Sequence, residues 1–173
     1  MPKKKAASST SSAVASATAA ASTAAASAAA DGSVLTASDY NTFQISSGTA
    51  GTAETEANAL FANIDMNNLA GVSAADLKVI KGIHDVAEDA ETDAFNPAID
   101  AASGDAATAL QNGKIKNKVL KLTAEVLGIQ VDAAQGGDDS DLAAEQAKLA
   151  NNIKLDTAAA GQASTAVSFT GTS

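Results

Sequence analysis

The strictest hydrophobic periodicity in the chain lies between about residues 105 and 134. Six apolar residues recur there at spacings of four, three, four, three and four, namely Ile115, Val119, Leu122, Val126, Ile129 and Ala133. This spacing places them along one face of an α-helix. A second apolar line, Leu120, Leu127 and Val131, is turned from the first by about 120 to 140°, since each residue advances the helix by about 100°. We therefore predict a long helix at the centre of the core, whose second line must also meet something apolar.

Two further helical patterns precede this segment. A first helix is expected to begin after Thr52 and to end near residue 67, with apolar residues at intervals of three and four. Ser73, with Asp76 three residues later, is typical of the start of a second helix, which extends to about residue 101. Because proline lacks the amide that a helix interior needs, we expect a kink at Asn96-Pro97, or a break with Asn96 capping a short new helix.

A fourth helix is expected after the turn at Gly136-Gly137, where three aspartates favour the positive end of a helix dipole. Four helices joined by connections of about two to six residues are typical of antiparallel neighbours. We therefore predict an all-α fold, an antiparallel up-down four-helix bundle over residues 51–161.

The flanking segments have a different pattern. Residues 31–50 and 162–173 are predicted to be extended arms, because 43–46 and 166–170 alternate apolar and polar residues. The Ala/Ser/Thr-rich leader, residues 1–30, offers no amphipathic face after its three lysines, so we predict that it is disordered. Alanine accounts for 44 of the 173 residues, whereas leucine, isoleucine, valine and phenylalanine together account for 32, of which 25 lie within 51–161. That number suffices for a slim core in which alanine lets helices approach closely.

The composition excludes several classes of protein and of site. The chain has no cysteine, arginine or tryptophan, and one histidine and one tyrosine. Disulfide scaffolds, thiolate metal sites, cysteine nucleophiles and arginine clamps are therefore excluded. The net charge of −9 repels a phosphate backbone, so we expect no nucleic-acid partner. No stretch is apolar enough to span a bilayer, and we find no glycine-rich phosphate loop or nucleophile elbow. We predict no catalytic residue, no cofactor and no enzymatic activity.

One row of side chains is a candidate for binding a divalent cation. On a helix His84, Glu88 and Glu91 fall at positions i, i+4 and i+7, in one line beside the core. Metal sites in bundles, however, draw ligands from several facing helices, typically with Glu-x-x-His motifs, and none occurs here. We therefore expect no metal, and a solvated acidic face with His84 paired to Glu88. A group of aspartates at 132, 138, 139 and 141 is explained more simply as acids at a helix start.

The second apolar line of the central helix is a candidate for apolar binding. Leu120, Leu127 and Val131 can pack against a flanking helix or the arms. Alternatively they meet a lipid-type ligand, a hydrophobic surface or a partner subunit.

Five segments carry a family resemblance: FQISSGTAG at 43–51, ANALF at 57–61, SAADLK at 73–78, HDVAEDAE at 84–91 and LQNGKIKNKVL at 110–120. Through them the chain, over roughly residues 40–173, resembles the cysteine-free small secreted proteins of filamentous fungi. The resemblance implies residence outside the cell and a role at the fungal surface or toward a host. That family has no established activity, so no site residue is implied.

Three functions follow as hypotheses. The first is a non-enzymatic secreted interaction protein or effector, whose partner belongs to a cell wall or a host. The second is a carrier or binder of apolar ligands or hydrophobic surfaces, with Leu120, Leu127 and Val131 as its residues. The third is a cation-binding bundle using His84, Glu88 and Glu91.

Overall fold

The computed structural model describes residues 32–173, so the predicted leader lies outside the described residues. The described chain is mostly helical, as the all-α prediction requires. Its elements are α1 (Tyr40–Phe43), β1 (Gly48–Thr49), α2 (Ala53–Leu60), the short 3₁₀ turn η1 (Leu69–Gly71), α3 (Ala74–Ala90), the π-helical segment η2 (Glu91–Phe95), α4 (Asn96–Ala101), α5 (Gly104–Ala134), α6 (Leu142–Ala158) and β2 (Ala163–Ser164). Within residues 32–173 we find no helix of the length and apolarity that a membrane crossing requires.

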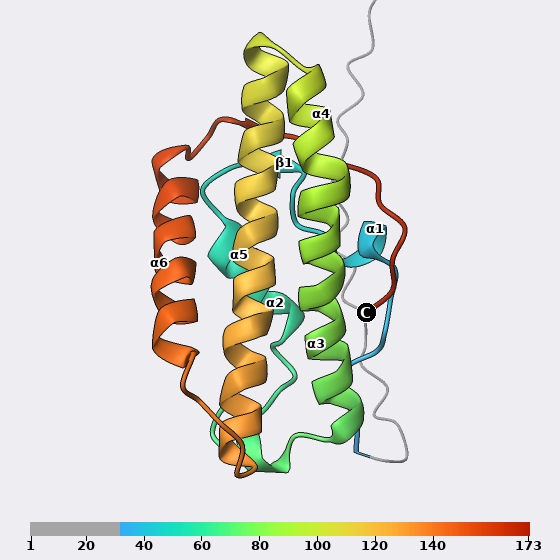
Figure 1. Cartoon of the computed structure of the whole chain (residues 1–173), viewed down its shortest axis with the longest axis vertical. Coiled ribbons are helices and arrows are strands. Elements are labelled where there is room, and N and C mark those ends of the chain that lie inside the picture. Colours follow the sequence, from blue (N-terminus) through green and yellow to red (C-terminus); the bar gives the residue numbers. More distant parts are fainter. Residues whose placement is uncertain (1–31) are drawn as a thin grey trace, which may run out of the picture.

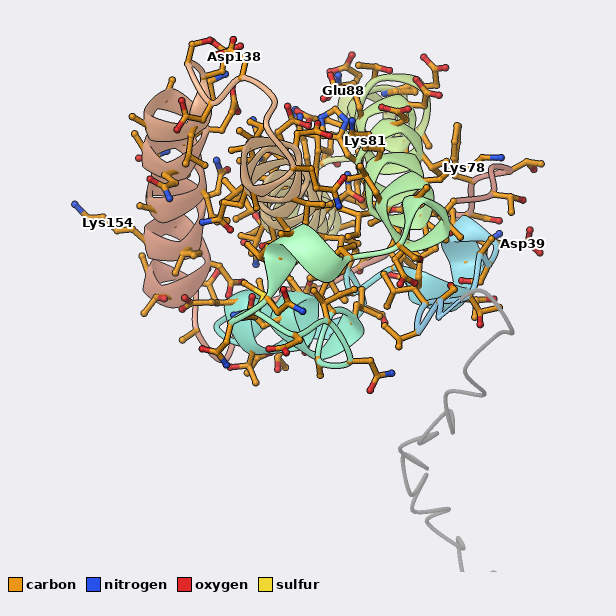
Figure 2. All side chains as sticks on the ribbon, turned by 90° about the horizontal axis from the view of Figure 1, so that it is seen from below. Asp39, Lys78, Lys81, Glu88, Asp138 and Lys154 are labelled. Atoms are coloured by element: carbon orange, nitrogen blue, oxygen red, sulfur yellow. The ribbon has the colours of Figure 1, made fainter. Side chains whose placement is uncertain are left out.

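Helix α5 is the centre of the molecule. It packs between α3 and α6, which lie on its two sides in one layer (Figure 1). Seen from below, α1 and α2 cover one face of this layer (Figure 2). The predicted four-helix bundle is not confirmed, because α2 has only eight residues. Together with the arms, it covers the face on which a fourth long helix would pack.

The face of α5 under α2 and the arms is the most deeply buried. Leu120 and Val131 are fully buried, Leu127 is 4% exposed, and all three belong to the hydrophobic core. The first apolar line is less completely covered: Ile115 and Ile129 are partly exposed. The line that looked secondary in the sequence therefore faces the main core, which also includes Val119 of the first line.

The helix does not break at Pro97. Ala90, Glu91, Phe95 and Asn96 all have right-handed helical backbone angles, and the amide of Asn96 bonds to the carbonyl of Glu91 five residues earlier. This wider turn lies directly before the proline and accommodates its ring and its missing amide. The predicted break, with Asn96 as a cap, is therefore wrong.

The two arms pair with each other and pack on the helices. Gly48 and Thr49 pair antiparallel with Ser164 and Ala163. The first arm is not wholly extended, since α1 forms one helical turn within it. This turn buries the Tyr40 ring, which meets a phenylalanine ring of each arm edge-on, with centroid distances of 5.6 Å and 5.8 Å. The arms thus contribute to the core directly.

Candidate functional site

The segment LQNGKIKNKVL at 110–120 forms part of α5 and uses its two faces differently. One face holds the arms. The Lys116 side chain is fully buried, and its Nζ donates to the carbonyl oxygens of Ser47 and Thr49, both at 3.1 Å, and pairs with Glu56 at 2.8 Å. These three oxygens replace the water that an ammonium group loses on burial.

Asn117 and Gly113, close to Lys116 in the same segment, also make contacts that depend on the identity of the residue. The Asn117 side chain accepts a hydrogen bond from the Tyr40 hydroxyl at 2.8 Å and donates to the Ala87 carbonyl at 2.8 Å. At Gly113 a β-carbon would lie 2.0 Å from the carbonyl oxygen of Thr165, so only glycine lets the second arm approach this closely. This half of the motif therefore has a structural role.

The other face of the motif surrounds a buried carboxylate of η2. Glu91 lies 2.8 Å from Lys121, 3.4 Å from Lys118 and 3.9 Å from Lys114. Burial by itself raises the pKa of Glu91, but the three lysines outweigh burial and hold it below its ordinary value of 4.5. Burial likewise lowers the pKa of Lys121, but Glu88 and Glu91 together keep it raised. The cluster is thus charged on both sides and pins η2 to α5.

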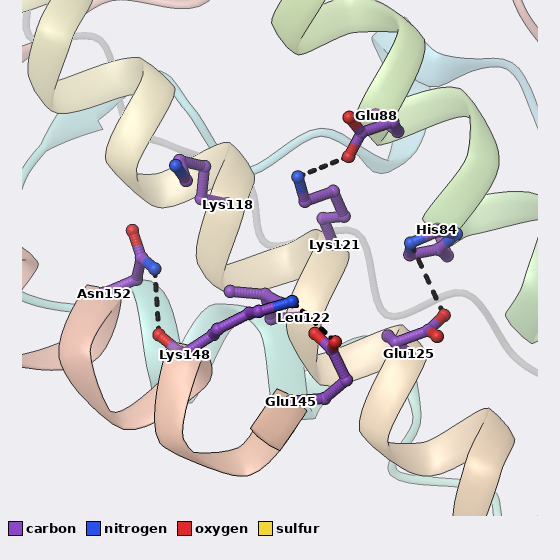
Figure 3. Close-up of a pocket in the computed structure, with 9 residues that line it drawn as sticks. All are labelled: His84, Glu88, Lys118, Lys121, Leu122, Glu125, Glu145, Lys148 and Asn152. Carbon is purple, nitrogen blue, oxygen red and sulfur yellow. Dashed lines mark hydrogen bonds and ion pairs between the residues drawn. The ribbon is translucent and has the colours of Figure 1, made fainter. Parts of the chain in front are cut away.

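Next to this cluster, the polar cleft is a hollow of about 260 Å³ between α3, α5 and α6. It is lined by His84, Glu88, Lys118, Lys121, Leu122, Glu125, Glu145, Lys148 and Asn152 (Figure 3). Six charged or titratable side chains of the cleft pair with one another, as the dashed lines in Figure 3 mark for Glu88 with Lys121, Glu145 with Lys148 and His84 with Glu125, whereas Lys118 pairs with Glu91 outside the cleft. Two of these pairs join α3 to α5, whereas Glu145 and Lys148 pair within α6.

The residues considered for a cation have other partners. His84 contacts Asp85 at 3.0 Å and Glu125 at 3.4 Å, and not Glu88, which pairs with Lys121. Glu91 faces the lysines. Within residues 32–173 no three histidine or acidic side chains are grouped as a metal ion requires. Two aspartates of the group around the end of α5 also have separate partners, since Asp132 pairs with Lys81 at 2.7 Å and Asp138 accepts from Ser140.

A second hollow, the apolar pocket, lies between α2, α5 and α6 and has a volume of about 380 Å³. It is lined by Asn58, Phe61, Ala62, Ile64, Met66, Thr123, Val126, Leu127, Gln130 and Leu149. Its size falls within the range of about 300 to 1,000 Å³ typical of small-molecule sites. Met66 at its edge is 57% exposed, which is unusual for a large apolar side chain in this molecule. Ligand pockets combine such apolar walls with a few polar groups.

Of the three residues that the sequence offered for apolar binding, the structure places only Leu127 at this pocket. Leu120 and Val131 pack in the core and do not line it. The α2 and α6 contributions, among them Phe61 and Leu149, were not identified from the sequence. They come from elements far apart in the chain, so no spacing in the sequence connects them.

One comparison with known proteins found a family match, and its limits lie in the two arms. A family model described as a domain of unknown function (DUF8454) matches residues 35–168. No curated protein and no solved structure matches the chain. The family match begins in the first arm, includes the 110–120 motif and both hollows, and ends in the second arm. Because it covers more than half of the chain, the protein belongs to the DUF8454 family of domains of unknown function.

Proposed function

We propose that this chain is a non-enzymatic binding protein that takes a small apolar molecule into the apolar pocket. The observation that carries the proposal is the contrast between the two hollows. The charged side chains that line the polar cleft already have ion-pair partners. The apolar pocket, in contrast, presents Phe61, Ile64, Val126, Leu127 and Leu149 to a space that no described side chain fills.

The energetic reason for binding is the removal of apolar surface from water. A ligand with about ten methylene groups gains roughly 0.8 kcal/mol for each one it buries, before the cost of association is subtracted. With an association cost of about 4 kcal/mol subtracted, about −4 kcal/mol remains, which corresponds to a dissociation constant in the millimolar range.

The proposal includes the setting that the family resemblance implies, outside the cell at a fungal surface or toward a host. A non-enzymatic role is supported by the contacts of the single histidine. Both ring nitrogens of His84 face carboxylates, Asp85 and Glu125, and neither faces a nucleophile. The imidazole thus joins α3 to α5.

Binding can be tested with 1-aminonaphthalene, a neutral apolar dye that is small enough for this pocket and whose fluorescence changes on leaving water. The full chain is expected to take up the dye, and Ala62→Phe, which narrows the pocket, is expected to weaken uptake at least about tenfold. Ala144→Phe, on an exposed position of α6, is the matched control and is expected to bind as the unaltered protein does. Equal binding by both variants would place the dye elsewhere and contradict the proposal.

A further inference from the structure

The chemical nature of the pocket walls narrows the class of ligand. All ten residues that line the apolar pocket are uncharged. A carboxylate or phosphate buried there loses its water without gaining an ion pair, which costs several kcal/mol. We infer that the ligand of this pocket is a neutral amphiphile, an apolar chain or ring system with a hydroxyl or carbonyl head. This inference rests on the proposed function.

The lysines of α5 do not offer an anion a partner at this site. Lys114, Lys118 and Lys121 contact acidic side chains of α3 and η2, and Lys116 is buried against the first arm and Glu56. None of them lines the apolar pocket. The net charge of −9 further disfavours the approach of an anion.

The pocket does offer hydrogen bonds to a neutral head group. Asn58 and Gln130 line it, and in the described part of the chain their side-chain amides make no hydrogen bond. Each amide supplies both a donor and an acceptor, which suits a hydroxyl or a carbonyl. The third polar group, the Thr123 hydroxyl, already donates to the Val119 carbonyl at 2.8 Å. The head group therefore has two free partners, one on α2 and one on α5.

The pocket volume sets the size of the probe. At roughly 30 Å³ for each heavy atom, the share that a water molecule occupies in the liquid, about 380 Å³ holds about a dozen heavy atoms. 1-Decanol and decanoate, which share a chain length and differ in head-group charge, form a matched pair at neutral pH.

The experiment measures the affinity of the full chain for both probes by displacement of 1-aminonaphthalene. Decanol is expected to bind at least about tenfold more tightly than decanoate. Gln130→Lys places a cation at the pocket and is expected to narrow or reverse this preference. Gln146→Lys adds the same charge on an exposed position of α6 and is expected to leave the preference unchanged.

The outcomes separate the two proposals. Decanoate binding as tightly as decanol to the unaltered chain overturns the neutral-ligand inference and leaves the apolar binding function standing. A preference that Gln146→Lys changes as much as Gln130→Lys also overturns it, because the discrimination then comes from net charge and not from the pocket. If neither probe binds and 1-aminonaphthalene is not taken up, the proposed function fails, and the inference fails with it.

Discussion

Asp76→Asn is expected to lower the free energy of unfolding by releasing the first arm from α3. The Asp76 carboxylate is buried, and it accepts hydrogen bonds from the amide of Leu35 at 2.7 Å, the amide of Val34 at 2.9 Å and the hydroxyls of Ser33 and Ser73, both at 2.9 Å. An asparagine keeps one acceptor oxygen, but its NH₂ group replaces the other oxygen and cannot accept a hydrogen bond from these N–H and O–H groups.

The magnitude follows from these contacts. A hydrogen bond to a charged group contributes about 1.5–3 kcal/mol, and the variant loses at least one of four such donors. We therefore expect a loss of about 2–4 kcal/mol, which is a large part of a typical total of about 5–15 kcal/mol. For a chain of this length the midpoint of thermal unfolding should fall by about 5–15 °C.

The loss of stability caused by Asp76→Asn should be smaller at acidic pH. Burial alone raises the pKa of Asp76, but the donors from Leu35, Ser33, Ser73 and Val34 outweigh it, so that the pKa in the folded state lies below its ordinary value of 3.8. The contribution is thus fully present above pH 3.8 and is lost as the pH falls through the lower folded-state value. The difference in stability between the unaltered protein and Asp76→Asn should shrink in acid.

Urea unfolding at pH 7 and at pH 3 measures both effects, and hydrogen exchange at the Val34 and Leu35 amides reports the release of the arm. Asp85→Asn is the matched control on the same helix, because its side chain is 74% exposed, and it should change stability by less than about 0.5 kcal/mol. Equal stability of Asp76→Asn and Asp85→Asn, or an Asp76→Asn deficit that is the same at both pH values, would contradict this role of the carboxylate.

Three further predictions concern buried contacts. Gly113→Ala should destabilise the protein by about 1–3 kcal/mol, since the new β-carbon would lie 2.0 Å from a backbone oxygen of Thr165. Gly128→Ala has its nearest neighbours at 3.8 Å and should stabilise the helix by about 0.5–1 kcal/mol. Urea unfolding measures both free energies, and a change of the same sign in the two variants would contradict this prediction. Burial raises the pKa of the only tyrosine, Tyr40, to about 12. Its contribution to stability should therefore be present below pH 10 and lost as the pH rises toward 12. An absorbance titration of the folded protein with a midpoint near pH 10 would be inconsistent with this burial. Glu91→Gln should lower the free energy of unfolding by about 2–4 kcal/mol, and this loss should persist in high salt because buried ion pairs are poorly screened. A loss of stability that salt abolishes would show that the ion pair acts at the surface.

The features that the sequence predicted well are those set by neighbours along the chain. The long helix was placed at about 105–134 and spans Gly104–Ala134, because its periodicity is strict and glycines flank it. The start of α3 was also placed correctly, since Ser73 accepts a hydrogen bond from the Asp76 amide at 3.0 Å. Both are local patterns that a helix satisfies within one or two turns.

The features that were missed depend on contacts between distant segments. Asp76 looked like part of a helix start, yet its main partners are more than forty residues away, in the first arm. The choice between the two apolar lines of α5 depends on which of them the arms cover, and no spacing within the helix records that. The apolar pocket has the same origin, because α2, α5 and α6 each contribute only part of its wall.

Buried polar groups explain how a chain with few large apolar residues fixes these distant contacts. Apolar side chains attract without direction, so a slim core leaves the position of each arm weakly determined. Lys116, Asn117 and Asp76 each reach an arm with hydrogen bonds that only one register satisfies, since a shifted arm would leave a buried charge or amide without partners. Asp156 on α6 fixes a contact between helices in the same way. It is 3% exposed and accepts a hydrogen bond at 2.9 Å from the amide of Ala53 at the start of α2. Because this last contact ties together the two helices that wall the apolar pocket beside α5, the shape of the pocket depends on a directional bond outside it as well as on its own apolar lining.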